Sequence, residues 1–486
     1  MKKKSLGLNA ILNGLQSLLN MIFPLITFPY ISRVLSVDGV GKYNFASSIN
    51  NYFLMIAALG ISTFAVREGA KLRDSREKIS EFASEVFTLN MVSTIVSYIL
   101  LILLLLLTPK LHRYIFAILI FSIQIVFTTL GTDWIYIIFE EYGYITVRNI
   151  IFKIISVIFL FVFVREPDDY LNYAAITVFA TSGSYILNFF HAKKFCDINV
   201  RLKVNWKKYL PPILTIFAST VAIQIYTSSD ITILGILKND YIVGIYSAST
   251  KIYNIIKGAL AAMTAVAIPR LAMLMGKEKT EEYNSLLSRL INITIIVFLP
   301  SMVGLFMLSS DVIRILSGYN YLRAATSLRI LCFGMILSAL AGIFNQCVLI
   351  PAKREKKTLL NTIIGATLNI FLNIQLIPKF SENGSALATV FAELIMVILN
   401  FYYGRDLLKP VFKDNKVFKN FFNVLISSVF IILICLACQM FINSIIIRLI
   451  VSTVCSVCVY IIVLILTKNS LVLDIISNLK MSLSNR

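Results

Sequence analysis

Apolar segments long enough to cross a lipid bilayer recur along the whole chain. A membrane-spanning helix needs about 20 predominantly apolar residues, and fourteen windows approach or exceed that length. They lie at about 9–34, 43–66, 82–108, 113–138, 145–164, 171–190, 210–237, 241–268, 285–308, 326–350, 359–377, 384–403, 418–442 and 445–467. Only 14% of the residues are charged, against about 25% in a soluble domain. We therefore predict an all-α polytopic membrane protein with about 14 transmembrane helices.

The distribution of Lys and Arg predicts how these helices are oriented. If the N-terminus is cytoplasmic, 31 of the 45 basic residues lie in inner segments, 10 in outer segments and 4 within helices. Cytoplasmic segments carry such an excess of Lys and Arg, so we expect both termini to be cytoplasmic and the helix number to be even. The net charge of +20 then reflects topology and contact with anionic lipid, and nucleic acid is not expected as a partner.

Two short segments recur at matching positions in the helix order. VGKYNFASSI at 40–49 is similar to VGIYSASTKI at 243–252, an offset of 203. TVFA at 177–180 recurs at 389–392, an offset of 212. Six helices, an even number, separate each segment from its counterpart, so the two copies have the same orientation in the membrane. Parallel repeats of this kind are typical of transporters built from two like lobes.

The repeat also predicts the domain organisation. We expect an N-lobe of six helices at 1–203, a C-lobe of six at 204–412, and two accessory helices with a cytoplasmic tail at 413–486. In the shared Val-Gly-x-Tyr motif, the glycine is expected to permit a tight turn into the helix. Tyr43 and Tyr246 are expected to be aromatic anchors at the outer membrane interface. The motif thus indicates architecture and does not mark a substrate site.

The segment FPLITFPYISRVLSVDGVGKYNFASS at 23–48 resembles the start of the Wzx-type flippases of polysaccharide repeat units. These belong to the multidrug/oligosaccharidyl-lipid/polysaccharide transporter superfamily. The resemblance extends through Gly-Ile-Ser at 60–62 to Arg67, and through 230–252. It implies a plan of six, six and two helices over the whole chain.

This resemblance also implies a function. A member of the family would move an undecaprenyl-diphosphate-linked oligosaccharide from the inner to the outer leaflet of the bacterial inner membrane, for O-antigen, capsule or another surface polysaccharide. It would need no cofactor. Its partners would be the polymerase and the glycosyltransferases that build the repeat unit. The resemblance does not identify the sugar.

Basic residues within or at the ends of helices are the candidate ligands for such a diphosphate. An ionisable side chain deep in a helix costs about 2.5–3.5 kcal/mol on insertion scales, so it usually faces a partner or a wet cavity. Lysine supplies point charges and arginine supplies bidentate donors to phosphate. The candidates, from helix interiors and then from helix ends, are Lys153, Lys251, Lys257, Arg33, Arg67 and Arg270.

Two acidic residues are candidates for coupling to a proton or sodium ion. Asp230 lies within a predicted helix, where a lone carboxyl group in a low dielectric could titrate, and Asp133 lies near the inner end of another. Ion pairing for structure is the alternative. Asp230 would then pair with Lys251, and Asp133 with Arg148 or Lys153.

Cysteine spacing offers a metal site that we do not predict. Cys435, Cys438, Cys455 and Cys458 have the C-x2-C-x16-C-x2-C spacing of a zinc ribbon. Both pairs lie in the middle of apolar windows, where deprotonated thiolates would be costly. Small polarizable packing residues are the favoured interpretation.

Three other functions compete with the flippase. A multidrug cation exporter of the same superfamily would need acidic residues in its cavity, whereas this chain places three lysines within its helices. A lipid II flippase is closer, and the sequence separates it poorly. A polysaccharide polymerase or membrane glycosyltransferase is disfavoured, because the predicted outer loops are short and carry no catalytic motif. We therefore expect a transporter and not an enzyme.

Overall fold

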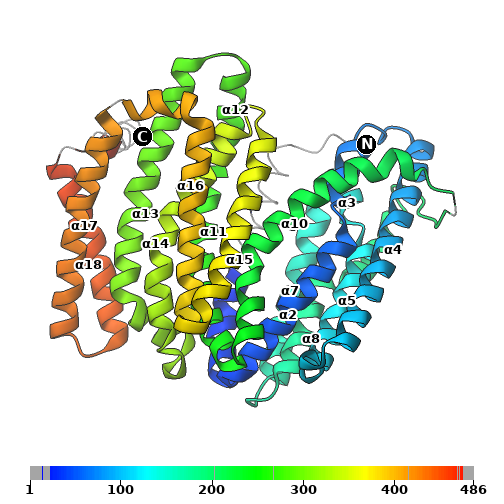
Figure 1. Ribbon diagram of the computed structural model, residues 1–486, viewed down its shortest axis with the longest axis horizontal. Helices are drawn as coiled ribbons and strands as arrows, with labels where there is room; N and C mark the ends of the chain where they lie inside the picture. Colours follow the sequence, from blue (N-terminus) through cyan, green and yellow to red (C-terminus); the bar gives the residue numbers. More distant parts are fainter. Residues whose placement is uncertain are drawn as a thin grey trace. The chain divides into compact units, whose positions relative to one another are not determined.

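Helices make up every regular element in the residues that the structure describes. The computed structural model describes residues 14, 22–201, 203–265, 267–413, 415–467, 469 and 471–473 (Figure 1). The predicted all-α class is confirmed. The chain divides into two compact units, Met1–Gly244 and Ile245–Arg486, which we call the N-unit and the C-unit and describe separately. The predicted lobe boundaries at 203/204 and 412/413 stay predictions.

The helices of the N-unit follow in chain order. They are Ile22–Val34, α2 (Val37–Ala58), α3 (Ile61–Gly69), α4 (Arg76–Leu107), η1 (Pro109–Tyr114), α5 (Ile115–Gly131), α6 (Asp133–Ile138), α7 (Tyr142–Phe163), α8 (Tyr170–Ser182), α9 (Tyr185–Ala192) and α10 (Trp206–Leu237). The next helix, α11 (Asp240–Ala265), begins in the N-unit and continues into the C-unit.

The remaining helices belong to the C-unit. They are α12 (Ile268–Gly276), α13 (Thr280–Ser317), η2 (Tyr319–Tyr321), α14 (Ala324–Ile343), η3 (Phe344–Leu349), α15 (Glu355–Phe380), α16 (Glu382–Lys413), α17 (Asn415–Phe441) and α18 (Ile445–Leu466). The predicted accessory helices are thus α17 and α18.

Within the described residues, eleven helices are long and apolar enough to cross a membrane. The predicted window 9–34 is described mainly from Ile22 onward, and the rest of it lies outside the described residues. The window 171–190 forms two helices, α8 and α9, separated at Gly183. The protein is a multi-pass membrane protein, whereas the count of fourteen helices and the orientation of the termini stay predictions.

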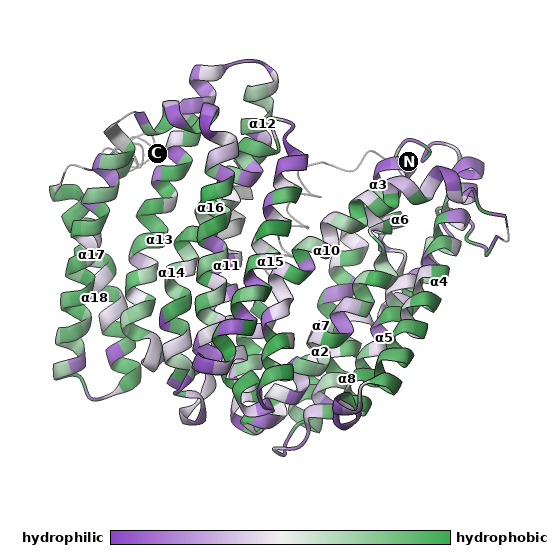
Figure 2. Ribbon diagram, viewed as in Figure 1, coloured by the Kyte–Doolittle hydropathy of each residue, from purple (hydrophilic) through white to green (hydrophobic). Residues whose placement is uncertain are grey.

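Exposed apolar faces show where lipid would contact the helices. On α4, Ile95, Ile99, Ile102 and Leu106 recur every three to four residues and are each at least 52% exposed. This spacing places them on one face of the helix. Figure 2 shows hydrophobic residues along much of the length of α4, α17 and α18 and many of the hydrophilic residues near helix ends. Lipid contact explains an apolar surface that would be a liability in water.

The repeat predicted from sequence is visible in matching hydrogen bonds. The Tyr43 hydroxyl lies 3.1 Å from the Thr177 hydroxyl in the N-unit, and the Tyr246 hydroxyl lies 3.3 Å from the Thr389 hydroxyl in the C-unit. Both tyrosines are buried. The prediction that they are interfacial anchors is wrong, because each joins the start of its helix to the helix that carries the TVFA segment.

The glycine of the motif has a different role from the one we predicted. Gly41 and Gly244 both lie inside helices, in α2 and α11. A Cβ atom on Gly41 would lie 1.8 Å from the Asp240 carbonyl oxygen, and one on Gly244 would lie 2.2 Å from the Val37 carbonyl oxygen. The motif glycines therefore permit close approach between α2 and the first turns of α11, and neither forms an entry turn.

Helix breaks also recur at matching positions. In the N-unit, α5 ends and α6 begins around Thr132, whose φ of 44° is left-handed. The offset of 212 takes Thr132 to Phe344, where α14 passes into the π-helical segment η3. A π-helix and a left-handed residue both interrupt the regular α-helical hydrogen bonds. The two repeats thus interrupt the same helix by different means.

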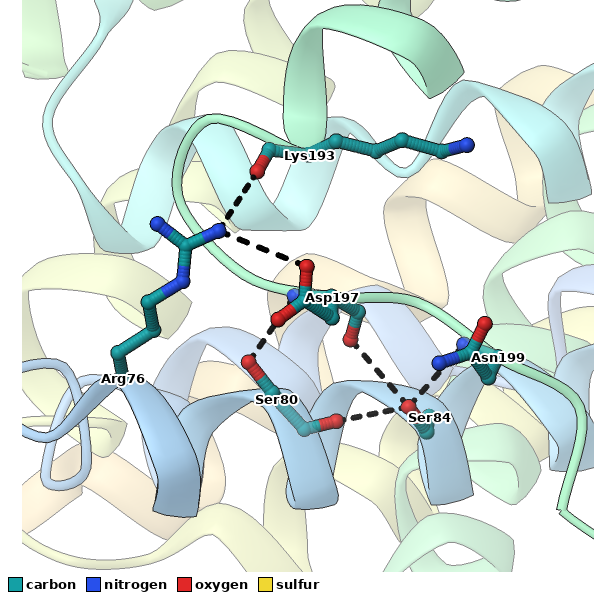
Figure 3. A network of polar contacts seen from close by, with 6 residues as sticks. All are labelled: Arg76, Ser80, Ser84, Lys193, Asp197 and Asn199. Carbon is teal, nitrogen blue, oxygen red and sulfur yellow. Dashed lines mark hydrogen bonds and ion pairs between the residues drawn. The ribbon is translucent and has the colours of Figure 1, made fainter.

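The segment that follows α9 runs in an extended form along α4. The backbone amides of Asp197, Asn199 and Arg201 donate to the hydroxyls of Ser80, Ser84 and Thr88, at 2.9, 3.1 and 2.9 Å. Figure 3 shows the first two of these contacts. The spacing fits because two extended residues advance about 6.6 Å and four helical residues about 6.0 Å. Three hydroxyl groups on α4 therefore hold the segment between α9 and α10 against α4.

Candidate functional site

The predicted candidate residues are distributed over both units, and the structure gives each a local setting. Arg33 is exposed and its guanidinium donates to the Pro29 carbonyl oxygen at 2.6 Å. Lys153 lies on α7, and its ammonium is 5.7 Å from the centre of the Phe23 ring. That distance is within the range of a cation–π contact. Lys153 is half-buried on a helix able to span the membrane.

The two arginines predicted at equivalent helix ends differ in their surroundings. Arg67 lies on α3 and forms an ion pair with the neighbouring Glu68 at 2.9 Å, and Glu68 also pairs with Lys71 at 2.6 Å. Arg270 is exposed in the first turn of α12. The Arg67 charge is therefore partly compensated by a neighbouring acid, and both side chains remain accessible.

Lys257, predicted as an anion ligand, forms an ion pair in the C-unit. Its ammonium lies 2.8 Å from the Glu393 carboxylate and 5.6 Å from the Tyr253 ring centre. Glu393 is only 4% exposed, whereas the Lys257 side chain is 37% exposed. Sequence reasoning assigned no role to Glu393. The repeat offered a signal that could have found it. Glu393 lies 212 residues after Thr181, so a carboxyl group in the second repeat stands where the first repeat has a hydroxyl.

Asp133 and Arg148 form the charged centre of the N-unit, as one alternative predicted. The Arg148 guanidinium lies 3.5 Å from the Asp133 carboxylate and is only 5% exposed. The Asn188 amide donates to Asp133 at 2.6 Å and to the Gly131 carbonyl oxygen at 3.0 Å. Tyr185 also forms a hydrogen bond with Asp133. The pair thus joins α6 to α7 and α9.

Asp230 and Lys251 lie in different units. Asp230 is buried on α10, and Lys251 is half-buried on α11. The surroundings of Asp230 on α10 include polar groups, because the Thr232 hydroxyl lies 3.1 Å from the Ser48 hydroxyl and 3.2 Å from the Tyr52 hydroxyl. The ion-coupling role of Asp230 and its predicted pairing with Lys251 stay predictions.

Three further ion pairs were missed because their residues were treated as loop charges. Arg113 and Tyr114 both contact Asp240, at 2.6 and 2.5 Å, and fix the first turn of α11. In the C-unit, Arg323 binds Glu382 through two nitrogens, at 2.5 and 3.0 Å. Counting charges per segment finds none of these, because each pair joins residues from different segments.

The third missed pair fastens the accessory helices. Arg448, at the start of α18, binds both oxygens of Asp311 on α13 at 2.7 and 2.5 Å. Near the other end of α13, the Asn420 amide donates to the Asn292 side chain at 2.9 Å. Between these contacts lies an apolar groove of about 470 Å³, lined by α13, α17 and α18. Polar contacts on either side of the groove therefore hold α17 and α18 against α13.

Cysteine chemistry gives no candidate centre in the described part of the chain. No group of three or more His, Cys, Asp and Glu residues there is arranged to hold a metal ion. Cys435 and Cys438 are buried, whereas Cys455 and Cys458 are exposed. Outside the membrane helices, burial raises the pKa of the Cys196 thiol to about 12, so this thiol stays protonated at neutral pH.

Two repeats of like helices, with charged residues held inside them, define a membrane protein of the transporter class. The family model described as "Polysaccharide biosynthesis protein" matches residues 6–275, more than half of the chain. The protein belongs to this family.

Curated relatives agree with this assignment. The chain is 25% identical over 277 residues to a protein of Escherichia coli K12 described as "Putative O-antigen transporter". That match covers 56% of this chain and 66% of the relative, so it spans just under two thirds of the relative's length. A protein of Shigella dysenteriae with the same description is 24% identical over 358 residues, covering 71% of this chain and 87% of the relative. Both descriptions are of transporters and not of enzymes.

Solved structures share the fold. A structure of the lipid II flippase MurJ in an inward closed conformation matches with a TM-score of 0.75, at 19% identity, over 96% of this chain and 99% of the other. An inward-facing multidrug resistance MATE family transporter of the MOP superfamily matches with a TM-score of 0.61, at 14% identity, over 81% of this chain and 99% of the other. At these identities the similarity shows the fold alone.

Proposed function

We propose that this protein is a flippase that moves undecaprenyl-diphosphate-linked oligosaccharide repeat units from the inner to the outer leaflet by alternating access. Family membership and the O-antigen relatives support this proposal. The observation that carries it is the match of residues 6–275 to the polysaccharide biosynthesis family, together with the two relatives described as O-antigen transporters. The fold shared with the lipid II flippase MurJ over 96% of the chain is compatible with it. The unmatched 4% is shorter than α17, with 27 residues, or α18, with 22, so the accessory helices are at least partly inside the shared fold.

Basic residues in each unit are the proposed ligands for the diphosphate. Lys153 is the leading candidate of the N-unit, because it is a half-buried cation on a helix able to span the membrane. Lys251 has the same role in the C-unit. Lys257 is a weaker candidate, because Glu393 compensates its charge. Arg67 and Arg270 would gather the anion at the predicted cytoplasmic ends, and Arg33 would contact it near the predicted outer end.

The membrane potential would favour outward movement of this substrate. Moving one elementary charge through 100 mV is worth about 2.3 kcal/mol, and a diphosphate diester carries negative charge out of a cell that is negative inside. The polyprenyl chain need not cross the bilayer with the sugar. The apolar groove on α13, α17 and α18 offers it a hydrocarbon surface. The partners of the protein would be the polymerase and the glycosyltransferases of the same polysaccharide.

Depletion of the protein in its native cell tests the function. We expect complete undecaprenyl-diphosphate-linked repeat units to accumulate on the inner leaflet, and the composition of that glycan would identify the substrate. Accumulation of incomplete units would instead indicate an enzyme of assembly. Accumulation of lipid II would indicate the peptidoglycan precursor as substrate. Unchanged glycans together with new sensitivity to cationic drugs would indicate a multidrug exporter.

A matched pair of lysine variants tests the proposed head-group contact. Lys153→Gln should reduce export of the repeat unit at least tenfold, the effect of losing about 1.4 kcal/mol of binding. Lys42→Gln is the control, because Lys42 is also half-buried and its ammonium lies 5.4 Å from the Tyr170 ring centre. Equal export by both variants, at equal abundance in the membrane, would remove Lys153 from the site.

A further inference from the structure

The charged centre of the N-unit is surrounded by buried polar atoms that have no partner. Thr132 Oγ1, Arg148 Nη1, Asn188 Oδ1 and His191 Nδ1 lack a hydrogen bond within the described residues. The first three belong to one place, because Thr132 precedes Asp133 in the chain, and Asn188 and Arg148 contact Asp133. His191 lies on α9 and stacks on Tyr144 of α7, with ring centres 4.1 Å apart. A buried polar group without a partner costs about 1–3 kcal/mol. Such a cluster indicates that a small polar species binds there.

The C-unit shows what this part of the repeat requires for packing alone. Asn400 corresponds to Asn188 and makes a similar bond, donating to the Ala341 carbonyl oxygen at 3.1 Å. Ala341 lies two residues before Ile343, the counterpart of Gly131. Asn345 stands at the Asp133 position, at an offset of 212, and accepts from the Thr358 hydroxyl at 2.8 Å. Asn361 stands at the Arg148 position, at an offset of 213, and donates to Asn400 at 2.8 Å.

Neutral amides thus join the same helices in the C-unit that a charged pair joins in the N-unit. Replacing a buried ion pair by well-packed hydrophobic residues of similar volume is often neutral or stabilising, and in the C-unit uncharged side chains hold the equivalent helices together. The helix packing therefore does not explain why the N-unit carries Asp133 and Arg148. A role that depends on the charge itself does.

The chemistry of the centre selects among the small species that could bind. A metal cation at Asp133 would be repelled by the Arg148 guanidinium, which lies 3.5 Å from the carboxylate. An anion at Arg148 would be repelled by Asp133. A proton meets the same repulsion from Arg148, but it needs only one carboxylate oxygen, whereas a metal cation needs several oxygen ligands. A water molecule can use the unpartnered donor and acceptor atoms.

We propose that Asp133 is a proton-binding site of the N-unit, and that Arg148, Thr132 and Asn188 hold the water through which the proton reaches it. The proposal deepens the flippase proposal, and rests on it only for the use made of the proton in transport. Proton binding would neutralise Asp133 and weaken its ion pair with Arg148. Because Asp133 begins α6, the short helix would then be held less firmly to α7.

Other titratable groups face this centre and must be distinguished from Asp133. Helix α7 contributes Tyr144 and Arg148, with Glu141 at its N-cap, and α9 contributes Tyr185 and His191. Tyr136 lies on α6 itself. From α3, which packs on α6, Arg67 and Glu68 pair with each other. His191 is the main competitor, because it is the only one of these whose ordinary pKa lies near 6.5.

A natural reporter lies beside the proposed site. The chain has two tryptophans, of which Trp134 is buried next to Asp133 and Trp206 is 41% exposed at the start of α10. In purified full-length Trp206→Phe protein, Trp134 is the only tryptophan, so its fluorescence reports on α6. We expect a one-proton change in emission with pH, accompanied by the infrared carbonyl band of a protonated carboxylic acid.

Four variants in the Trp206→Phe background decide the assignment. Asp133→Asn should abolish both signals, and Asp133→Glu should keep both with a shifted midpoint. Asp74→Asn and His191→Gln should leave both unchanged, since Asp74 is an exposed acid of the α3–α4 connection. Signals that persist in Asp133→Asn, that vanish in His191→Gln, or that never occur in Trp206→Phe overturn the proposal. If Asp133→Asn does not fold, Asp133→Glu and His191→Gln still separate the two groups.

These measurements need no transport and no substrate. Failure of the proton site would leave the accumulation of lipid-linked glycans on depletion unaffected, so the flippase proposal would stand. Conversely, a titrating Asp133 together with no accumulation of such glycans would leave the proton site in place and remove the flippase.

Discussion

The two repeats of this protein share hydrogen bonds but differ in where they carry charge. Matching bonds join Tyr43 to Thr177 and Tyr246 to Thr389, and Asn188 and Asn400 both cap a carbonyl at the same helix interruption. Around that interruption the N-unit is charged and the C-unit carries amides. The bonds that recur are those that the fold requires of each repeat.

At a second position the difference is reversed. In the N-unit, Asn50 donates to Gln124 at 3.4 Å and Gln124 donates to Thr181 at 3.0 Å. In the C-unit, the positions of Asn50 and Thr181 hold Tyr253 and Glu393, and Glu393 pairs with Lys257. Each repeat therefore supplies an uncharged control for the charged centre of the other. The difference teaches that neither charged centre is needed to pack its helices.

The largest expected effect comes from removing one partner of the Lys257–Glu393 ion pair in the C-unit. Glu393→Gln leaves the Lys257 ammonium without its partner inside the unit. Removing one member of a buried ion pair costs about 3–5 kcal/mol, and the 37% exposure of the Lys257 side chain favours the lower end. Thermal unfolding in detergent, followed by size-exclusion chromatography, should show a marked loss of stability.

The N-unit residues provide the rescue for this variant. Leu54 and Thr181 stand at the positions of Lys257 and Glu393, so the double variant Lys257→Leu with Glu393→Thr copies the uncharged arrangement. It should recover most of the stability. If Glu393→Gln alone is as stable as the double variant, the pair does not behave as a buried ion pair and the comparison between repeats loses its basis there.

The same exchange in the N-unit should have a smaller effect. Arg148→Ala leaves Asp133 without its guanidinium partner. We expect a cost below the roughly 3–5 kcal/mol of a fully buried pair, since the pair is long at 3.5 Å and the Asp133 side chain is 35% exposed. Asp133→Asn with Arg148→Asn copies the amides of the C-unit and should unfold near the wild-type temperature. A double variant less stable than Arg148→Ala would show that the N-unit needs its charges for packing.

Substitution of the motif glycines tests the shared helix contact. Gly41→Ala and Gly244→Ala would place a Cβ atom 1.8 and 2.2 Å from backbone carbonyl oxygens, and overpacking of this kind costs about 1–3 kcal/mol. Gly304→Ala is the control, because nothing lies within 4 Å of its Cβ position and alanine is the better helix former by about 1 kcal/mol. Equal unfolding temperatures for all three variants would contradict the close approach.

Sequence patterns predicted the features that depend on composition and order, and missed those that depend on contact. Apolar windows and repeat offsets gave the helical class and placed Tyr43 and Tyr246 at equivalent positions. They could not give the environment of those side chains, because a tyrosine at a helix start produces the same sequence pattern whether it faces the membrane interface or a neighbouring helix. Pairing of Asp133 with Arg148 was among the predicted alternatives because the two residues are close in sequence. The Lys257–Glu393 pair was missed because its residues are 136 positions apart.

The smallest expected effect is the sharpest test of equivalence between the repeats. Tyr43→Phe and Tyr246→Phe each remove one hydroxyl that meets a threonine hydroxyl, worth about 0.5–1.5 kcal/mol. Both rings stay in place, so each loss reports on the hydrogen bond. Thr177→Val and Thr389→Val provide the other arm of a double-mutant cycle in each unit. Because the two bonds have nearly the same length, we expect coupling energies that agree within about 0.5 kcal/mol. A coupling energy in only one unit would show that the hydrogen bond stabilises that unit alone, although the contact has nearly the same length in both.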